Sequence, residues 1–224
     1  MKAIRAVLFD LDGTLADTAP DLGGALNLLL AEIGAPPVPL DVSRPLTSSG
    51  ARGMLKAGLG LGPEDARYEP LKARFLELYE QNICRHTSLF DGIEHMLGAL
   101  EAQSVPWGIV TNKQERFTYP LLRALGLERR AGCIVGGDTA PRPKPYPDPL
   151  LHAARLLSLP PAACLYVGDD LRDVQAARAA GMPSLAAAYG YLGEEGDPAA
   201  WRADAVIAHP REVLNFLAEP PRVG

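Results

Sequence analysis

Five short, mostly apolar runs and a shorter sixth at 204–208 alternate with helical patterns, and this alternation limits the fold more than any other feature. Parallel strands covered by helices on both faces have this pattern, because both sides of each strand are then buried. The expected fold is α/β, with a Rossmann-like parallel sheet. The five longer runs are "IRAVLF" (4–9), "VPWGIV" (105–110), "GCIVG" (132–136), "ACLYVG" (163–168) and "SLAAAY" (184–189).

The alternation is interrupted after the first run. Between about residues 18 and 87 we find only helical patterns, such as "SGARGMLKAGLG", separated by proline- and glycine-rich connectors. A connection of this length with helices of its own is typical of an inserted domain rather than a loop. We therefore expect a core formed by residues 1–17 and 88–224, and a helical domain formed by residues 18–87.

The first helix of the inserted stretch has readable ends. Thr18 is placed to cap its amino end, Pro20 lies in its first turn, and Gly34 ends it. The spacing of apolar residues predicts one buried face. That face comprises Leu22, Ala25, Leu26, Leu29, Leu30 and Ile33.

Charge and hydropathy exclude two classes of partner. Lys and Arg number 22 against 27 Asp and Glu, for a net charge of −5, so the chain lacks the basic field that nucleic-acid binding requires. No stretch approaches the about 18 to 20 apolar residues that span a bilayer, and the first apolar run is too short for a secretory signal. Three widely separated cysteines, Cys84, Cys133 and Cys164, predict reduced thiols in a cytoplasmic protein.

In an open parallel sheet, ligands bind at the carboxyl ends of the strands, so the residues at those ends are the candidates for chemistry. The first strand ends in "LFDLDGTL", where Asp10 and Asp12 project to the same side and Gly13 allows a sharp turn. Two carboxylates this close repel unless a cation lies between them, which favours a divalent metal, acid–base chemistry, or both. The alternative is an Asx turn followed by a helix cap.

Two further strand ends carry groups suited to an anion. Thr111 and Asn112 follow the second strand, just before a helical pattern whose free N–H groups favour an anion, although either residue also suits a helix cap. Lys144 lies after the third strand in "PRPKPYPDP" and offers a compact positive charge. The alternatives for this segment are a semi-rigid connector with a solvated lysine, or a polyproline ligand.

The fourth strand ends in "GDDLRD", with Asp169, Asp170 and Asp173 at the start of a helix. We expect Asp169 and Asp173 to share one helical face. Carboxylates at this position suit a magnesium site, or they compensate the helix dipole. Each of the four signals is weak alone, but they occur in order at four successive strand ends.

Taken together, "DLDGT", "VTN", the lysine of "PRPKPYPDP" and "GDDLRD" resemble the motifs of the haloacid dehalogenase superfamily of phosphatases, over nearly the whole chain. The resemblance implies that residues 18–87 form a helical cap of the C1 type. It also implies that Asp10 is the nucleophile that forms an aspartyl-phosphate, and that Asp12 acts first as acid and then as base.

The resemblance implies roles for the remaining motif residues as well. Mg²⁺ would be held by the Asp10 side chain, the Asp12 backbone carbonyl and Asp169. Thr111 and Lys144 would bind the phosphoryl oxygens, with Lys144 also pairing with Asp10. Asp170 and Asp173 would orient the metal site, and Asn112 and Gly13 would assist substrate binding.

The presence of Asp12 favours phosphoryl transfer, because the dehalogenases of the superfamily lack this second carboxylate. Within the phosphatases the chain resembles the phosphoglycolate phosphatase group at "GGDTAPRPKPYPDPLL", and it is also similar to N-acetylmuramic acid 6-phosphate phosphatase at "GARGML". The expected partner is a small phosphorylated metabolite, most simply 2-phosphoglycolate, with N-acetylmuramic acid 6-phosphate hydrolysis or sugar phosphomutase activity as alternatives. A monomer or a homodimer is expected.

Two single residues complete the expectations. Arg52 is a candidate for contacting a carboxylate or phosphate of the substrate, and the alternative is a solvated helix arginine. If the prolines brace Lys144 against Asp10, Lys144→Ala should impair catalysis far more than stability. A non-catalytic binding protein is disfavoured because Asp10, Asp12 and Lys144 are all present.

Overall fold

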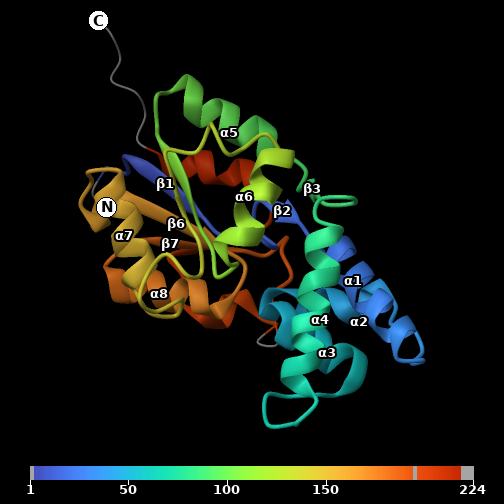
Figure 1. Cartoon of the computed structure of the whole chain (residues 1–224). Helices are drawn as coiled ribbons and strands as arrows, with labels where there is room; N and C mark the ends of the chain where they lie inside the picture. The colour runs from blue at the N-terminus through green and yellow to red at the C-terminus, as the bar shows by residue number, and fades with distance from the viewer. Residues whose placement is uncertain (1–2, 194–195, 218–224) are drawn as a thin grey trace, which may run out of the picture.

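The computed structural model describes residues 3–193 and 196–217, and within these ranges six parallel strands form the central sheet (Figure 1). Each strand lies inside one of the six predicted runs, so the predicted α/β fold is confirmed. The strands are β1 (Ala6–Phe9), β4 (Trp107–Val110), β5 (Cys133–Val135), β6 (Cys164–Gly168), β7 (Ser184–Ala187) and β8 (Ala205–Ile207).

The strand order β5-β4-β1-β6-β7-β8 places β1 inside the sheet. The chain first adds β4 and β5 on one side of β1, then returns to add β6, β7 and β8 on the other side. This is the Rossmann order, and its point of reversal leaves a crevice at the carboxyl ends of the strands. The residues that follow β1, β4 and β6 therefore meet at one edge of the sheet.

Helices cover both faces of this sheet, as Figure 1 shows. On one face, α5 (Ile93–Ala102) and α6 (Glu115–Ala124) pack over Val7 and Phe9 of β1. On the other face, α7 (Asp148–Leu156) and α8 (Leu171–Ala180) pack over Ala6 and Leu8. Successive β1 side chains alternate between two buried faces, which explains why Ala6–Phe9 are all apolar.

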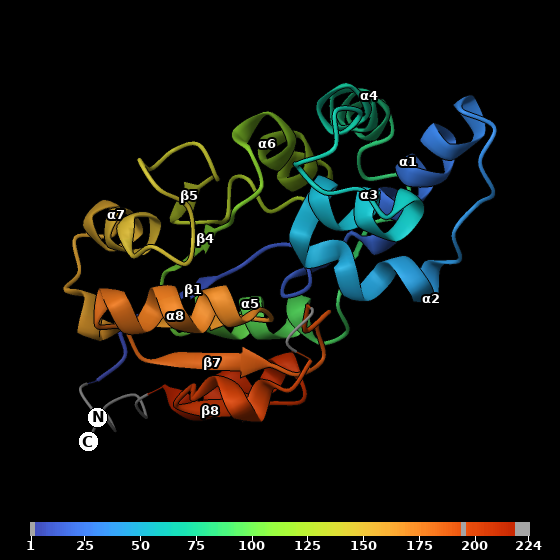
Figure 2. The ribbon, with the colours of Figure 1, turned by 90° about the horizontal axis from the view of Figure 1, so that it is seen from below.

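The inserted stretch forms a helical bundle (residues 19–81) with a hydrophobic cluster of its own, in which Leu26, Met54 and Phe75 are fully buried. Figures 1 and 2 both show the bundle gathered at one side of the sheet, and Phe117 of α6 packs into its cluster. The bundle consists of α1 (Ala19–Glu32), α2 (Leu40–Ser43), the 3₁₀ helix Arg44–Ser49, α3 (Gly50–Leu59) and α4 (Tyr68–Gln81).

Helix α1 differs from its prediction at Thr18 and at Ile33. The side chain of Thr18 occupies the N-cap position but makes no capping hydrogen bond, because its hydroxyl donates to Asp12 instead. At the other end the helix stops at Glu32, and Gly34 follows the C-cap with a φ of +70°, as predicted. Ile33, however, is 46% exposed rather than part of the buried face. The other five predicted face residues are buried.

The two chain passages between sheet and bundle run side by side, a feature that the sequence did not reveal. They pair as the antiparallel strands β2 (Ala16–Asp17) and β3 (Ser88–Leu89). Asp17 also accepts two hydrogen bonds from Arg44 of the bundle and one from the hydroxyl of Tyr191. The connection is thus held by both backbone and side-chain contacts.

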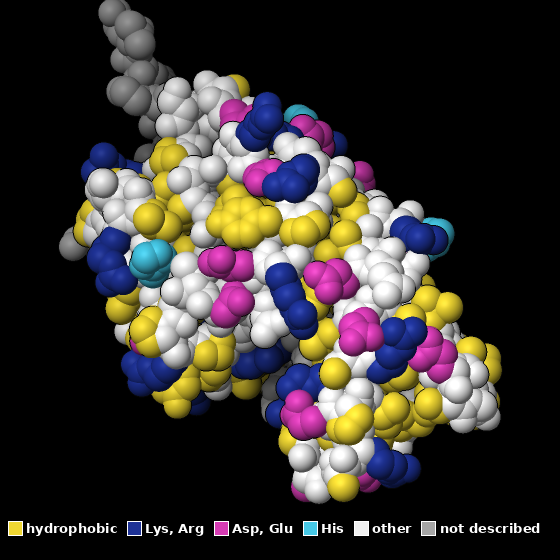
Figure 3. Space-filling view, viewed as in Figure 1, with side chains coloured by type: hydrophobic (Ala, Val, Ile, Leu, Met, Phe, Trp, Pro, Cys, Tyr) yellow, Lys and Arg dark blue, Asp and Glu magenta, His cyan; other side chains and the backbone are white. Residues whose placement is uncertain are grey.

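The surface and the cysteines add three observations. Within the described residues, no helix combines the length and apolar character needed to cross a membrane. Basic and acidic side chains are interspersed over the face that Figure 3 shows. All three cysteines lie in the described ranges and are free thiols, with Cys133 and Cys164 buried.

Candidate active site

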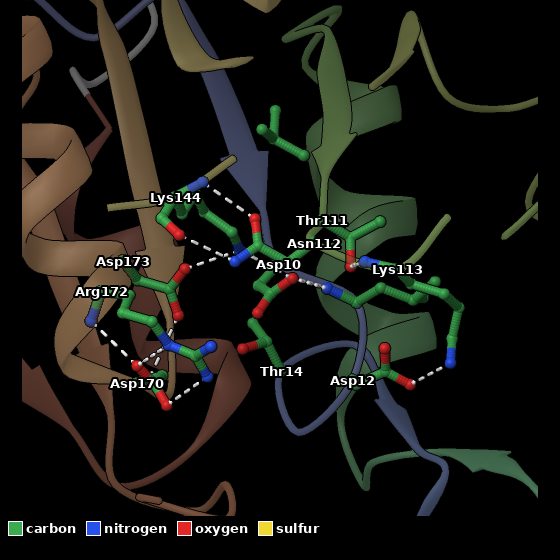
Figure 4. A network of polar contacts seen from close by, with 12 residues as sticks. Asp10, Asp12, Thr14, Thr111, Asn112, Lys113, Lys144, Asp170, Arg172 and Asp173 are labelled. Carbon is green, nitrogen blue, oxygen red and sulfur yellow. Dashed lines mark hydrogen bonds and ion pairs between the residues drawn. The ribbon is translucent and has the colours of Figure 1, made fainter. Parts of the chain in front are cut away.

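The predicted site residues of four strand ends meet at the carboxyl edge of the sheet (Figure 4). Asp10 follows β1, Thr111 follows β4, Asp169 follows β6, and Lys144 reaches the same place from the loop between β5 and α7. Asp10 and Lys144 make direct contact, at 2.9 Å between Lys144 Nζ and Asp10 Oδ1. The sheet thus gathers residues that lie far apart in the sequence.

Lys144 is almost completely buried, with 4% of its surface exposed. Besides Asp10, its ammonium group lies 2.7 Å from Asp173 Oδ1 and donates to the hydroxyl of Tyr166 at 2.9 Å. Burial by itself lowers the pKa of Lys144, but the charges of Asp10 and Asp173 outweigh it and raise that pKa. Lys144 is therefore charged, and the alternative of a solvated connector lysine is wrong.

Asn112 holds the backbone of the lysine loop. Its side-chain amide donates to the carbonyl of Lys144 at 2.9 Å, and its carbonyl oxygen accepts from the Lys144 N–H at 2.9 Å. The sequence predicts that Asn112 binds the substrate. Asn112 does line the cavity, but both ends of its side-chain amide bond the backbone of Lys144. Asn112 thus helps to set the position of Lys144.

Three carboxylates, those of Asp10, Asp169 and Asp173, have oxygens within 4.8 Å of one another. Asp169 is fully buried and accepts hydrogen bonds from the hydroxyl of Thr14 at 2.8 Å and the N–H of Tyr191 at 2.9 Å. Among the described residues it has no ion-pair partner. Burial, together with the charges of Asp10 and Asp173, raises the pKa of Asp169 well above its ordinary value.

A divalent cation fits this cluster. Lys144 contacts Asp10 and Asp173 but makes no ion pair with Asp169, so one lysine charge faces three carboxylates. Every donor in the cluster is a carboxylate oxygen, which is the ligand type that Mg²⁺ prefers. A cation beside Asp169 would offset both causes that raise its pKa.

Gly13 lies against the cluster rather than in the cavity. Its φ of +84° favours glycine, and a Cβ there would collide with the carboxylate of Asp169. Its N–H donates to the carbonyl of Ala16 at 3.0 Å. The sequence predicts a substrate contact for Gly13, but Gly13 is absent from the residues that line the cavity.

Asp170 and Asp173 form the amino-terminal cap of α8. Asp170 is the N-cap and accepts from the N–H of Arg172, while Asp173 Oδ2 accepts from the N–H of Asp170 at 3.1 Å. Asp170 therefore lies where its charge compensates the helix dipole, which was the alternative to a magnesium site. It also forms an ion pair with Arg172. Asp169 precedes the helix, so the expected shared helical face with Asp173 is wrong, although both reach the cluster.

The carboxylate of Asp12 lies apart from the cluster, as Figure 4 shows. Its Oδ1 accepts from the hydroxyl of Thr18 at 2.6 Å and lies 3.1 Å from Nζ of Lys113. Burial lowers the pKa of Lys113, but the charge of Asp12 and the hydroxyl of Tyr79 raise it overall. Asp10 and Asp12 thus have different partners, although only one residue lies between them in the sequence.

A cavity of about 360 Å³ lies between these groups and the bundle and is lined by residues of both. Asp10, Asp12 and Thr111 line it from the sheet side, and Arg52 lines it from α3. Among the described residues, Arg52 has no hydrogen-bond or ion-pair partner. Aromatic side chains of the bundle complete the wall, namely Tyr68, Phe75 and Tyr79.

Several residues of the site were not predicted. Thr14 and Tyr166 contact the carboxylates or Lys144, and Lys113 pairs with Asp12. Lys113 carries a usable signal, because it follows Thr111 and Asn112 in "VTNK" at the same strand end. Thr14 and Tyr166 carry none, since a threonine in a turn and a tyrosine in a buried strand are ordinary residues.

The chain is similar to known proteins over most of its length. The family model of haloacid dehalogenase-like hydrolases matches residues 7–187. The chain is 42% identical to the N-acetylmuramic acid 6-phosphate phosphatase of Pseudomonas putida over 96% of each chain. It is 45% identical to the phosphoglycolate phosphatase of Xanthomonas campestris pv. campestris, over 98% of this chain and 99% of the relative.

The fold is also similar to solved structures. A crystal structure of a predicted phosphoglycolate phosphatase from Haemophilus somnus superimposes with a TM-score of 0.84 and 26% sequence identity. The match covers 96% of this chain and 99% of that one.

Proposed function

The chain belongs to the haloacid dehalogenase-like hydrolases and is a phosphatase, and from this premise we propose that it hydrolyses phosphomonoesters through an aspartyl-phosphate on Asp10, with Mg²⁺ as cofactor. The observation that carries the proposal is the position of Asp10, which faces the cavity, pairs with Lys144 and lies beside Asp169. A carboxylate so placed is oriented for attack on a phosphate held in the cavity.

In the first step, a carboxylate oxygen of Asp10 attacks phosphorus and the bond from phosphorus to the ester oxygen breaks. The electron pair of that bond stays on the ester oxygen, which takes a proton from Asp12 and leaves as an alcohol. Lys144 and Thr111 bind phosphoryl oxygens, since Lys144 pairs with Asp10 and both residues line the same cavity as Asp10. Positioning and charge stabilisation account for most of the catalysis in phosphoryl transfer.

In the second step, Asp12 takes a proton from water as the water oxygen attacks phosphorus. The bond between phosphorus and Asp10 breaks, which restores the Asp10 carboxylate and releases inorganic phosphate. The same Asp12 carboxylate serves as acid and then as base, and Lys113 and Thr18 hold one of its oxygens throughout.

Asp10 and Asp169, with the backbone carbonyl of Asp12, would hold the Mg²⁺ ion. When bound, the ion offsets the charge of the carboxylates and of the phosphate, which otherwise repel each other. Asp173 fixes Lys144 beside the site. Thr14 and the N–H of Tyr191 orient Asp169.

Removal of divalent cations is expected to abolish phosphate release, and added Mg²⁺ to restore it. Because the native site holds the cation and the unfolded chain does not, Mg²⁺ should also raise the melting temperature. Phosphate release and thermal unfolding, each measured in EDTA and after Mg²⁺ addition, test both effects. Undiminished activity in the chelator would refute the metal role.

We propose the bundle, with its connections at residues 18–87, as the cap of this site. It supplies one wall of the cavity, and its Ser48 reaches the cluster by donating to Asp169 at 3.3 Å. The backbone carbonyl of Ser48 also accepts from Arg172 at 2.7 Å. These contacts support a bundle that covers the reacting groups and shields them from bulk solvent.

We propose that the substrate carries a carboxylate in addition to its phosphate, and that Arg52 binds it. Both 2-phosphoglycolate and N-acetylmuramic acid 6-phosphate have this composition. The cavity favours the second, because about 300 Å³ or more is typical of pockets that bury drug-sized ligands, and a two-carbon acid fills little of it. The aromatic side chains of Tyr68, Phe75 and Tyr79 suit a sugar ring with apolar substituents.

Arg52→Ala is expected to raise KM about tenfold for both of these substrates, which corresponds to about 1.4 kcal/mol of lost binding. A contact made equally before and during the reaction changes KM and leaves kcat nearly unchanged. p-Nitrophenyl phosphate, which has no carboxylate, should show little change in KM.

Phosphate release from the three esters by the wild type and the variant tests this expectation. Arg67→Ala is the matched control, because Arg67 pairs with Asp65 on the bundle surface and does not line the cavity. An equal rise in KM for p-nitrophenyl phosphate would assign Arg52 to the phosphate rather than to a carboxylate.

A further inference from the structure

Lys113 links the bundle to the acid–base residue. Its ammonium group lies 3.1 Å from Oδ1 of Asp12 and donates to the hydroxyl of Tyr79 at 3.1 Å. The same group lies over the Tyr79 ring, 4.6 Å from its centroid. With 8% of its side chain exposed, Lys113 has little freedom to adopt another position.

The two partners of Lys113 come from different parts of the chain. Asp12 follows β1, whereas Tyr79 belongs to α4 of the bundle and is almost fully buried. The Tyr79 ring packs against Phe117 of α6, with 5.5 Å between ring centroids. Lys113 therefore keeps both contacts only while α4 lies against the site.

The contacts on Asp12 distinguish its two oxygens. Oδ1 receives the hydrogen bond from Thr18 and the ion pair from Lys113. Oδ2 has no partner among the described residues. Since Asp12 lines the cavity, Oδ2 is the oxygen left to exchange a proton with a bound ester.

We propose that Lys113 is a positioning residue, which turns Asp12 so that Oδ2 faces the ester oxygen of the substrate, and that Tyr79 holds Lys113 in place when the bundle covers the site. The inference rests on the proposed function. Proton transfer from Asp12 is thereby tied to the presence of the bundle over the bound ester.

The proposal predicts a dependence on the leaving group. An alkyl ester leaves as an alkoxide, which needs the proton from Asp12, whereas p-nitrophenolate is stable without it. General acid catalysis contributes about 10² to 10⁴-fold to such a step. We expect Lys113→Met to lower kcat/KM about 10 to 100-fold for an alkyl phosphate, and much less for p-nitrophenyl phosphate.

Tyr79→Phe provides a second variant that keeps the fold. It removes only the hydroxyl that accepts from Lys113, and the ring remains to pack against Phe117. Its effect should have the same direction as that of Lys113→Met and be smaller. Lys113→Arg keeps a cation beside Asp12, so its kcat/KM for an alkyl phosphate should lie between those of Lys113→Met and the wild type.

The measurement is kcat/KM for 2-phosphoglycolate, N-acetylmuramic acid 6-phosphate and p-nitrophenyl phosphate, because kcat/KM reports the steps up to the departure of the alcohol. Lys72→Met is the matched control. Lys72 lines the same cavity but pairs with Glu69, so its loss should leave the ratio of alkyl to aryl rates unchanged.

The positioning role would be overturned if the ratio of alkyl to aryl kcat/KM in Lys113→Met equalled that of the wild type, whether both values fell equally or neither changed. These outcomes are distinct from a failure of the proposed function, in which the wild type would release phosphate from none of the esters.

Discussion

Replacing Asp10 with asparagine is expected to lower phosphate release by about 10⁴-fold or more, the scale seen when a nucleophile is removed. The fold should persist for a reason visible in the site. Lys144 loses one carboxylate but keeps Asp173 at 2.7 Å, so its buried charge retains a partner. Loss of one of three clustered carboxylates also reduces their mutual repulsion.

Phosphate release and the melting temperature, measured on the same preparation, test this prediction. Asp204→Asn is a suitable control, because Asp204 accepts from the N–H of Ser184 at the opposite end of the strands. Normal turnover by Asp10→Asn would rule out Asp10 as the nucleophile. Loss of activity together with loss of the fold would contradict the structural reason given for its stability.

Lys144→Ala is expected to impair both catalysis and stability. Activity should fall by about 10³-fold, since a charged group that binds the transferred phosphoryl oxygens is lost. Stability should fall by about 3 to 5 kcal/mol, the usual cost of removing one partner from a buried ion pair. The sequence-based expectation that stability is largely spared is therefore revised, because Lys144 is buried between Asp10 and Asp173.

Urea unfolding and phosphate release measure the two effects. Lys144→Met removes the charge but fills more of the same volume than alanine does. The difference in stability between the two variants therefore reports the lost packing, and the loss that they share reports the ion pairs. If both variants unfold at the same urea concentration as the wild type, the ammonium group contributes nothing to the fold. Phosphate release near that of the wild type would show that Lys144 has no part in catalysis.

The sheet and the assembly of the site were predictable from the sequence, for one physical reason. Strands covered on both faces are apolar throughout, so their runs stand out, and β1 alternates between two buried faces as expected. Parallel strands then bring their carboxyl ends to one edge. Asp10, Thr111 and Asp169 could therefore be placed together without any contact being known.

The remaining contacts depend on tertiary structure and left little trace in the sequence. Thr18 looks like a helix cap, yet its hydroxyl is used by Asp12. Strands β2 and β3 have two residues each, too few to show alternation. Lys113 and Tyr79 are 34 positions apart, and only the packing of α4 against α6 brings them together.

Asp10 carries the phosphoryl group in the proposed mechanism, and this can be measured directly. The wild type, mixed with N-acetylmuramic acid 6-phosphate or 2-phosphoglycolate and quenched in acid within one turnover, is digested and analysed by mass spectrometry. We predict the mass of one phosphoryl group on the peptide that contains Asp10, and its removal by hydroxylamine. Phosphate release with no modification of that peptide, or with the phosphoryl group on another residue, would contradict the account.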